Sequence, residues 1–250
     1  MSVKVGSVGM KSLYLGSQEI VKAYVGQELV YSENKPSRLP EGYTEIAYIQ
    51  LGPDNTTLRN FPIALCRTDQ TIVMNFEIIE FPVSSGSSFY SNRPCLLYSK
   101  YVSSNTGYAR DALWLSKDGL YANASTYSMT TKNEMQLSSD MTVPQMFSLL
   151  WDGPNMCVSI NGEEPKSFAQ YGVGSNWLIG SDSAGTTSTD CWRAACARIY
   201  SLKIASDGST SSSYNKNYVP ARDSNGKVGL YDLLNSKFIY HASLIAGPAI

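Results

Sequence analysis

Residues 146–162 read MFSLLWDGPNMCVSING, and this stretch decides the fold class. Two short apolar runs, 146–151 and 156–160, each end at a dipeptide typical of tight turns, Asp152-Gly153 and Asn161-Gly162. Glycine and asparagine tolerate the positive φ angles that two-residue β-hairpin loops require. Apolar and small side chains alternate along the second run, which directs one of its faces inward. The stretch therefore predicts an antiparallel hairpin with one buried face.

Similar runs, rich in β-branched and aromatic residues, recur on both sides of this hairpin and are separated by clusters of Gly, Asn, Asp and Ser. The candidate strands are Thr44–Gln50, Thr71–Phe81, Cys95–Tyr101, Ala112–Leu115, Gly119–Ala122, Gln145–Trp151, Asn155–Ile160, Trp177–Ile179, Ala194–Ile204 and Lys227–Asp232. No helical period is sustained over three turns. Many short strands without intervening helices predict an all-β, antiparallel β-sandwich over residues 42–250.

A ten-residue repeat precedes this region. Gly6, Gly16 and Gly26 stand ten residues apart, and Tyr14 and Tyr24 occupy the same position before the second and third glycines. Ten residues suit a short strand, a tight turn at the glycine and a return strand. Such a unit is too small to bury a core alone, so it needs neighbouring repeats or other chains. We predict a β-repeat module for attachment or oligomerisation, and expect a homotrimer.

The repeats and the sandwich are joined by a polar stretch. Residues 32–42 contain two prolines and a glycine and have little apolar content. This composition is typical of a semi-rigid linker. We therefore predict a module at 1–32, a linker at 33–41 and a sandwich at 42–250.

Composition and charge exclude several functions. Charged residues make up 16% of the chain, the net charge is −1, and the Lys and Arg residues are scattered. Neither a nucleic-acid footprint nor a basic membrane patch is present. No run approaches the ~20 apolar residues needed to span a bilayer, and no positively charged N-terminal stretch precedes an apolar one. We expect no nucleic-acid partner, no membrane insertion and no export signal within the chain.

The five cysteines include no Cys-x-x-Cys pair. Cys157 lies in an apparent strand and Cys196 lies among small residues. Because free cysteines behave as small hydrophobic residues, we predict buried thiols rather than a disulfide framework. A Cys191–Cys196 bridge is the alternative.

Three stretches resemble the concanavalin A-like lectin/glucanase sandwich, in the laminin-G-like form common in phage and prophage proteins. They are the beginning, LPEGYTEIAYI (39–49), the hairpin at 151–162, and the end, with ARIYSLKI (197–204), YVPARD (218–223), VGLYD (228–232) and AGP (246–248). The N-terminal repeat is also similar to the short Tyr-Leu-Gly-Ser repeats ahead of such domains in phage structural proteins. The chain departs from the family after Ile49 and over residues 84–140, so the resemblance does not supply a ligand specificity.

The resemblance implies a jelly-roll sandwich in a bacteriophage virion protein, a fibre or decoration component of the head or tail. Its partners would be other virion proteins and a cell-surface glycan, and it would be assembled in the host cytoplasm. A free bacterial carbohydrate-binding protein is the first alternative, although a secretion signal is expected there. A glucanase-like hydrolase is the second.

The acidic residues argue against a hydrolase. Glucanases of this fold carry Glu-x-Asp-x-x-Glu on one strand face, so that an acid and a nucleophile meet across the sugar. This spacing is absent, and Glu77 with Glu80 and Glu163 with Glu164 are interpreted as solvated edge charges. The single histidine, His241, cannot supply a multi-histidine zinc site and is interpreted as a surface or packing residue. We predict no catalytic residues and no enzymatic activity.

The candidate glycan site lies at a polar loop. Trp177 and Trp192 flank the segment 180–190, which contains Asp182 and Asp190. Aromatic rings stack on the apolar faces of sugars while polar groups bind the hydroxyls. The alternative is that both indoles cap the core and the loop merely closes one end of the sandwich. Trp114 and Trp151 fall in predicted strands, and we expect them to pack in the core. The same loop offers oxygen ligands to Ca²⁺, but Ca²⁺ needs 6–8 of them, so we expect a plain polar loop without a metal or cofactor.

Overall fold

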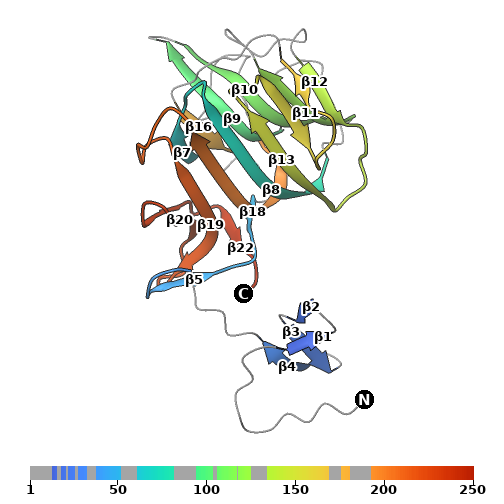
Figure 1. Cartoon of the computed structure of the whole chain (residues 1–250), viewed down its shortest axis with the longest axis vertical. Helices are drawn as coiled ribbons and strands as arrows, with labels where there is room; N and C mark the ends of the chain where they lie inside the picture. The colour runs from blue at the N-terminus through green and yellow to red at the C-terminus, as the bar shows by residue number, and fades with distance from the viewer. Residues whose placement is uncertain are drawn as a thin grey trace. The chain divides into compact units, whose positions relative to one another are not determined.

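The computed structural model describes residues 13–15, 18–20, 22–25, 28–32, 38–51, 61–81, 94–103, 106–116, 118–124, 134–168, 176–180 and 193–250. The chain divides into two compact units, Met1–Arg38 and Leu39–Ile250 (Figure 1). Every regular element among the described residues is a β-strand. No helix long and apolar enough to cross a membrane occurs in this part of the chain.

The first unit contains two hairpins. Strand β1 (Leu13–Leu15) pairs with β2 (Gln18–Ile20), and β3 (Lys22–Val25) pairs with β4 (Glu28–Ser32), both antiparallel. Tyr14 lies opposite Glu19, and Tyr24 lies opposite Leu29. The strands predicted around the second and third repeat glycines are thus confirmed. Gly6, Gly16 and Gly26 themselves lie outside the described residues.

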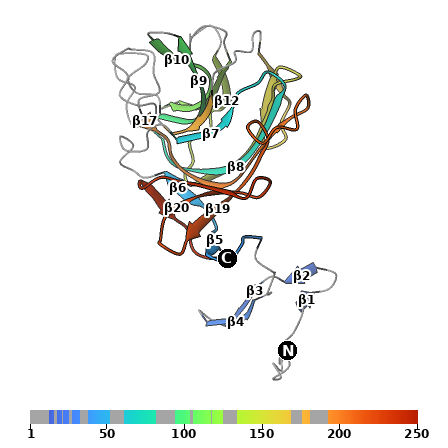
Figure 2. The same ribbon diagram turned by 90° about the vertical axis from the view of Figure 1, so that its left-hand side faces the viewer.

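The second unit is a sandwich of two sheets, shown as separate layers in Figure 2. The smaller sheet has the order β12-β11-β10-β9-β16-β7, with β17 paired to β9. Its strands are β7 (Phe61–Leu65), β9 (Pro94–Ser103), β10 (Thr106–Ser116), β11 (Gly119–Ala124), β12 (Glu134–Ser138), β16 (Asn176–Ile179) and β17 (Arg193–Ala194). The β17–β9 pair is parallel, and the other pairs described in this sheet are antiparallel.

The larger sheet has the order β15-β14-β13-β8-β18-β19-β20-β21, and β5, β6 and β22 pair with it laterally. Its strands are β5 (Tyr43–Glu45), β6 (Ile49–Leu51), β8 (Gln70–Glu80), β13 (Gln145–Asp152), β14 (Cys157–Ile160), β15 (Lys166–Ser167), β18 (Cys196–Ser206), β19 (Lys216–Asp223), β20 (Val228–Asp232), β21 (Lys237–Tyr240) and β22 (Leu244–Ala246). The predicted all-β, antiparallel sandwich is confirmed.

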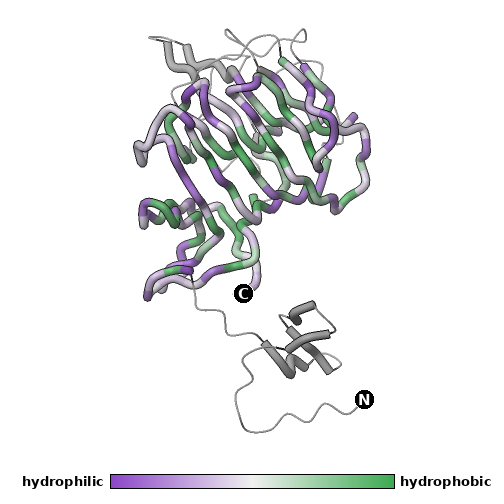
Figure 3. Tube along the Cα trace, viewed as in Figure 1, coloured by the Kyte–Doolittle hydropathy of each residue, from purple (hydrophilic) through white to green (hydrophobic). Residues whose placement is uncertain are grey.

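The main core lies between the sheets. Along β8 the even-numbered residues Ile72, Met74, Phe76 and Ile78 are buried, and the odd-numbered residues face outward. Figure 3 shows the resulting alternation of hydrophobic and hydrophilic residues along the strands. This two-residue period follows from the pleat, which directs successive side chains to opposite faces. The odd-numbered residues of β8 therefore lie on the outer face of the larger sheet.

The hairpin that indicated the fold is present, with one correction. Asn161 and Gly162 have φ angles of 53° and 72°, as the predicted turn requires. The turn predicted at Asp152-Gly153 is wrong, because the connection runs over Gly153–Met156 and its positive φ, 50°, belongs to Met156. Asp152 fixes this longer loop by accepting hydrogen bonds from the backbone N–H and the side-chain amide of Asn155, at 3.2 and 2.8 Å.

Two segments at the start of the sandwich differ from the predictions. The predicted strand Thr44–Gln50 is two strands, β5 and β6, separated by residues 46–48. Within this break the Ala47 N–H donates to the Pro248 carbonyl. Leu39, assigned to the linker from the sequence, is buried in a cluster with Val219, Ala221 and Tyr231. The sandwich unit consequently begins at Leu39, because this apolar side chain packs on it.

The cysteines also differ in part. Cys66, Cys157 and Cys196 are not disulfide-bonded, so a Cys191–Cys196 bridge does not form. Cys95 is disulfide-bonded, which corrects the prediction of a free thiol at this position. Its side chain is fully buried in a second cluster with Tyr98, Trp114 and Leu178, and this cluster is separate from the core between the sheets.

Candidate functional site

Trp177 does not form an open platform. Its side chain is 1% exposed, and its indole lies edge-on to Trp151 of the opposite sheet, at 5.8 Å between centroids. The indole N–H donates to Gln70 Oε1 at 2.8 Å. The ring therefore belongs to the core, and the prediction that it stacks on a sugar is wrong. The other candidates, Trp192, Asp182 and Asp190, lie outside the described residues. Trp114 and Trp151 are buried, as predicted.

Gln70, the partner of Trp177, joins several loops at one end of the sandwich. Its buried amide donates to the carbonyls of Leu65 and Tyr214 at 2.9 and 3.2 Å. Its Oε1 also accepts a hydrogen bond from the Arg67 backbone N–H at 2.9 Å. The backbone carbonyl of Gln70 accepts one from the Gly153 N–H at 3.0 Å. The side chain and the backbone carbonyl of Gln70 thus connect the β7–β8 turn, the β13–β14 loop and the loop before β19.

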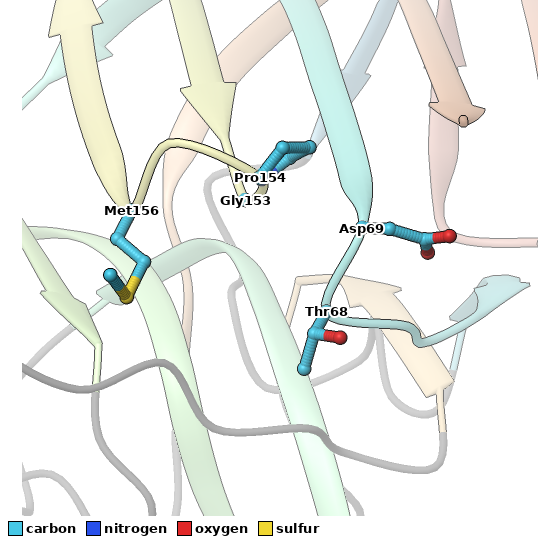
Figure 4. A pocket seen from close by; sticks show the side chains of 5 residues that line it. All are labelled: Thr68, Asp69, Gly153, Pro154 and Met156. Carbon is cyan, nitrogen blue, oxygen red and sulfur yellow. The ribbon is translucent and has the colours of Figure 1, made fainter. Parts of the chain in front are cut away.

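A shallow hollow of about 370 Å³ lies beside this junction, lined by Thr68, Asp69, Gly153, Pro154 and Met156 (Figure 4). Figure 4 shows the Asp69 carboxylate directed away from Met156. The groups available to a ligand in this hollow are chiefly the hydroxyl of the exposed Thr68, the Pro154 ring and the Met156 side chain. Since sugar recognition needs several directed polar groups, this hollow is a poor glycan site.

The Asp69 carboxylate is fully engaged in a structural network. It accepts from Arg67 Nε at 2.8 Å and Arg67 Nη2 at 3.0 Å, from Ser206 Oγ at 2.8 Å, and from the Gly208 N–H at 3.0 Å. The Arg67 guanidinium also lies 5.1 Å from the centre of the Tyr214 ring. The hydrogen bonds from Arg67, with those from Ser206 and Gly208, hold the pKa of Asp69 well below its ordinary value. This carboxylate stays ionised and does not act as an acid.

An Asp69→Asn variant should lose part of the acid sensitivity of the fold. A carboxyl whose pKa is lower in the folded state stabilises the protein above its unfolded pKa, near 4, and this stabilisation fades as the pH falls toward the folded pKa. Urea unfolding at successive pH values below about 5 should therefore show a shallower loss of stability in the variant. Glu163→Gln, at an exposed turn, is the control. An unchanged pH slope in Asp69→Asn would contradict the role of this network.

A second candidate binding surface, with more polar groups than the hollow, lies on the outer face of the larger sheet. Cross-strand register places Met146, Glu77, Arg198, Gln50 and Ile245 in one line across β13, β8, β18, β6 and β22. Residues directly opposite each other in antiparallel pairs share a face of the sheet. We call this line the transverse row. Three polar side chains occupy its centre, and exposed apolar side chains occupy both ends.

The centre of the transverse row is a preformed network. Arg198 Nη1 lies 2.9 Å from Glu77 Oε2, and Arg198 Nε donates to Gln50 Oε1 at 3.0 Å. The Tyr200 hydroxyl donates to the same Glu77 oxygen at 3.0 Å. Burial and this hydrogen bond to Glu77 raise the pKa of Tyr200, so the hydroxyl remains a donor. The guanidinium also lies over the Tyr48 ring at 4.6 Å, which restricts its position.

The interpretation of Glu77 as a solvated edge charge is therefore wrong. Glu77 lies in β8 between β13 and β18, and its side chain is 12% exposed and paired with Arg198. The sequence did not indicate this pair, because 121 residues separate the partners. Glu80, Glu163 and Glu164 are exposed, as predicted.

A second polar line runs beside the transverse row. Ser148 lies opposite Asn75, and Asn75 lies opposite Ser201. The Asn75 amide donates to Ser201 Oγ at 2.9 Å. Hydroxyl, amide, carboxylate and guanidinium groups therefore lie on one exposed sheet surface in fixed positions. Such a surface can bind hydroxyl-rich molecules without first being ordered.

The remaining chemical candidates have structural roles in the described part of the chain. His241 is partly buried with its ring near Phe61, and Nδ1 accepts from the Ser243 N–H at 3.2 Å. Burial lowers the pKa of this imidazole. It is a packing histidine, as predicted. Within the described ranges no three His, Cys, Asp or Glu side chains gather where they could hold a metal ion, and residues 181–190 of the candidate Ca²⁺ loop lie outside those ranges.

Comparisons with known proteins give little further information. No family model matches the chain, and no curated protein matches it. Among solved structures, the chain is similar to a native heptameric SAP-like pentraxin from Limulus polyphemus, with a TM-score of 0.38 and 10% identity, over 83% of this chain and 94% of that one. At this TM-score the likeness carries no argument about function.

Proposed function

We propose that this chain is a bacteriophage virion structural protein, a fibre or decoration component of the head or tail. Its N-terminal repeats would attach it to other virion proteins and trimerise it. Its sandwich would bind a glycan on the host surface. The protein would be assembled in the host cytoplasm and act without catalysing a reaction. The proposal rests on the resemblance of the repeats and the sandwich to phage structural proteins, together with the site described above.

The observation that carries the adhesive part is the transverse row. Its central side chains are partly exposed on the outer face of the larger sheet and are held by mutual hydrogen bonds, so little entropy is lost when a ligand binds. The row contains one carboxylate, that of Glu77, paired with Arg198. Glycoside hydrolysis normally uses two carboxyl groups flanking the scissile bond. The arrangement supports binding rather than hydrolysis.

The deciding experiment is to locate the protein in purified particles. Antibodies against the sandwich should decorate phage particles in immunogold electron microscopy. A free bacterial carbohydrate-binding protein is the second candidate, favoured by the disulfide of Cys95, because disulfides persist mainly in oxidising compartments. For that candidate, the label would be found in the culture supernatant and not on particles.

Deleting residues 1–32 should convert the oligomer to a folded monomer. Each hairpin is a two-stranded sheet of short strands, which is not stable by itself in water and requires partners. The sandwich keeps its own core, because Leu39 and all later residues form a separate compact unit. Light scattering should report about three chains for the full protein and one for the truncated protein. An oligomer that survives the deletion would place the interface in the sandwich.

A further inference from the structure

From the described residues we infer that the transverse row binds a neutral oligosaccharide whose chain runs across the strands, with several sugar rings in contact at once. The inference rests on the proposed glycan-binding function. It adds the ligand class, the location of the site and the direction of the bound chain.

The length of the row indicates an extended ligand. The row crosses the pairs β13–β8, β8–β18, β18–β6 and β6–β22. Neighbouring strands lie ~4.8 Å apart, so these four steps span about 19 Å. This distance exceeds the size of a single sugar ring. A monosaccharide would contact only part of the row, whereas an oligosaccharide lying along it would contact the centre and both ends.

The hydrogen-bonding groups favour hydroxyls. Three atoms at the centre of the row can bind a ligand: the donors Arg198 Nη2 and Gln50 Nε2, and the acceptor Glu77 Oε1. None of the three has a hydrogen-bond partner among the described residues. A sugar hydroxyl both donates and accepts, so neighbouring hydroxyls can use all three atoms. A carboxylate on a ligand can only accept hydrogen bonds, so it could not use the acceptor Glu77 Oε1.

The charges favour a neutral ligand. Arg198 is neutralised by Glu77 at 2.9 Å, so an acidic sugar drawn to the guanidinium would also come close to the Glu77 carboxylate. Two like charges a few ångströms apart repel each other strongly in a partly desolvated site. Glu77 is therefore a specificity-determining residue that excludes acidic glycans.

The apolar ends of the row suit the C–H faces of the outer sugar rings. Met146 is 50% exposed and Ile245 is 46% exposed. Single exposed apolar residues are common on protein surfaces. Here they lie in register on either side of the same polar network, on β13 and β22. This placement gives end sugars an apolar contact while the central sugars bind through hydrogen bonds.

The test uses the full chain on a printed array of neutral and acidic bacterial oligosaccharides, from monosaccharides to hexasaccharides. We expect binding to neutral members that strengthens with length until the row is filled. Arg198→Ala should weaken it at least tenfold. Lys203→Ala is the matched control, because Lys203 is exposed on the same sheet face opposite Val73 and lies outside the row; it should bind as the wild type does.

Two further variants are chosen so that unfolding does not account for a change in binding. Glu77→Gln keeps the side-chain shape and should admit acidic oligosaccharides that the wild type rejects, because the repelling charge is gone. Met146→Ser, at an exposed position, should weaken binding of long oligosaccharides while leaving disaccharides unaffected. Thermal unfolding of each variant confirms that it is folded.

The outcomes separate the two proposals. Preference for acidic glycans, affinity independent of length, or equal binding by wild type and folded Arg198→Ala would overturn the inference while leaving glycan adhesion in place. Absence of binding to any glycan would overturn the inference and the adhesive function together. The immunogold result on particles decides the virion role separately.

Discussion

Replacing Asp232 with alanine should destabilise the sandwich by roughly 3–5 kcal/mol, the usual loss when one partner of a buried ion pair is removed. The Asp232 side chain is 1% exposed, and its Oδ2 lies 3.3 Å from Nζ of Lys216, which is 11% exposed. Its Oδ1 accepts from the backbone N–H groups of Asn217 and Leu234, both at 3.1 Å. Alanine would leave a buried ammonium and these N–H groups unpaired. The denaturation midpoint in urea measures the effect.

A double variant tests the cause. Lys216→Met combined with Asp232→Ala removes both charges, and replacing a buried ion pair by apolar side chains is often nearly neutral. The double variant should therefore be more stable than Asp232→Ala alone. If the two are equally unstable, the loss comes from the groups that donate hydrogen bonds to Asp232, which are the backbone N–H groups of Asn217 and Leu234 and the Asn235 amide, and not from the buried lysine.

Replacing Gln70 with alanine should destabilise the fold by about 3 kcal/mol or more, because each buried polar group left unpaired costs ~1–3 kcal/mol. The substitution removes the partners of the Trp177 indole N–H, the Arg67 N–H and the carbonyls of Leu65 and Tyr214. It also releases the connection between strands and loops at this end of the sandwich. Chemical denaturation followed by tryptophan fluorescence measures the loss.

Trp177→Phe is the matched control. It removes one of these hydrogen bonds and keeps an aromatic ring in the core, while Gln70 retains its bonds to Arg67, Leu65 and Tyr214. We expect a distinctly smaller loss than in Gln70→Ala. A loss as large as that of Gln70→Ala would show that packing of the indole against Trp151, rather than the amide network, stabilises this end.

These two buried networks differ in exposure from the network around Arg198. The polar networks around Asp232 and Gln70 are buried and join loops to strands. The network around Arg198 also consists of hydrogen bonds and an ion pair, but it lies on the outer face of the larger sheet, where the Arg198 side chain is 31% exposed. Stability should respond strongly to changes in the first two networks. Ligand binding should respond mainly to changes in the third.

Much of the fold follows from local sequence. The alternation along 146–160 and the Asn161-Gly162 dipeptide identified β13, β14 and the turn after them, because the strand period and positive φ are properties of neighbouring residues. The predicted set lacks six strands of the sandwich, β7, β12, β15, β19, β21 and β22. Two of these, β7 and β19, have a common reason. Each contains a proline, Pro62 or Pro220, which argues against a strand when only local propensity is considered.

The burial of Trp177 was decided by tertiary structure. The run Trp177-Leu178-Ile179 is apolar throughout, so its sequence shows no alternation between faces. In the structure Trp177 and Ile179 face the core between the sheets, and Leu178 packs in the second cluster. A strand covered on both faces is a continuous apolar run, so its sequence does not show toward which face its aromatic side chain points.

The candidate site likewise depends on long-range register. Gln50, Glu77 and Arg198 each fit an ordinary strand by sequence, and nothing local marks them as neighbours. The antiparallel pairing of β18 with both β6 and β8 brings together side chains separated by 148 and 121 residues. The sequence by itself determined the all-β class, many of the strands and the Asn161-Gly162 turn of this protein. Only the tertiary structure decided which side chains share a face, because sheet register is set by packing of the whole core.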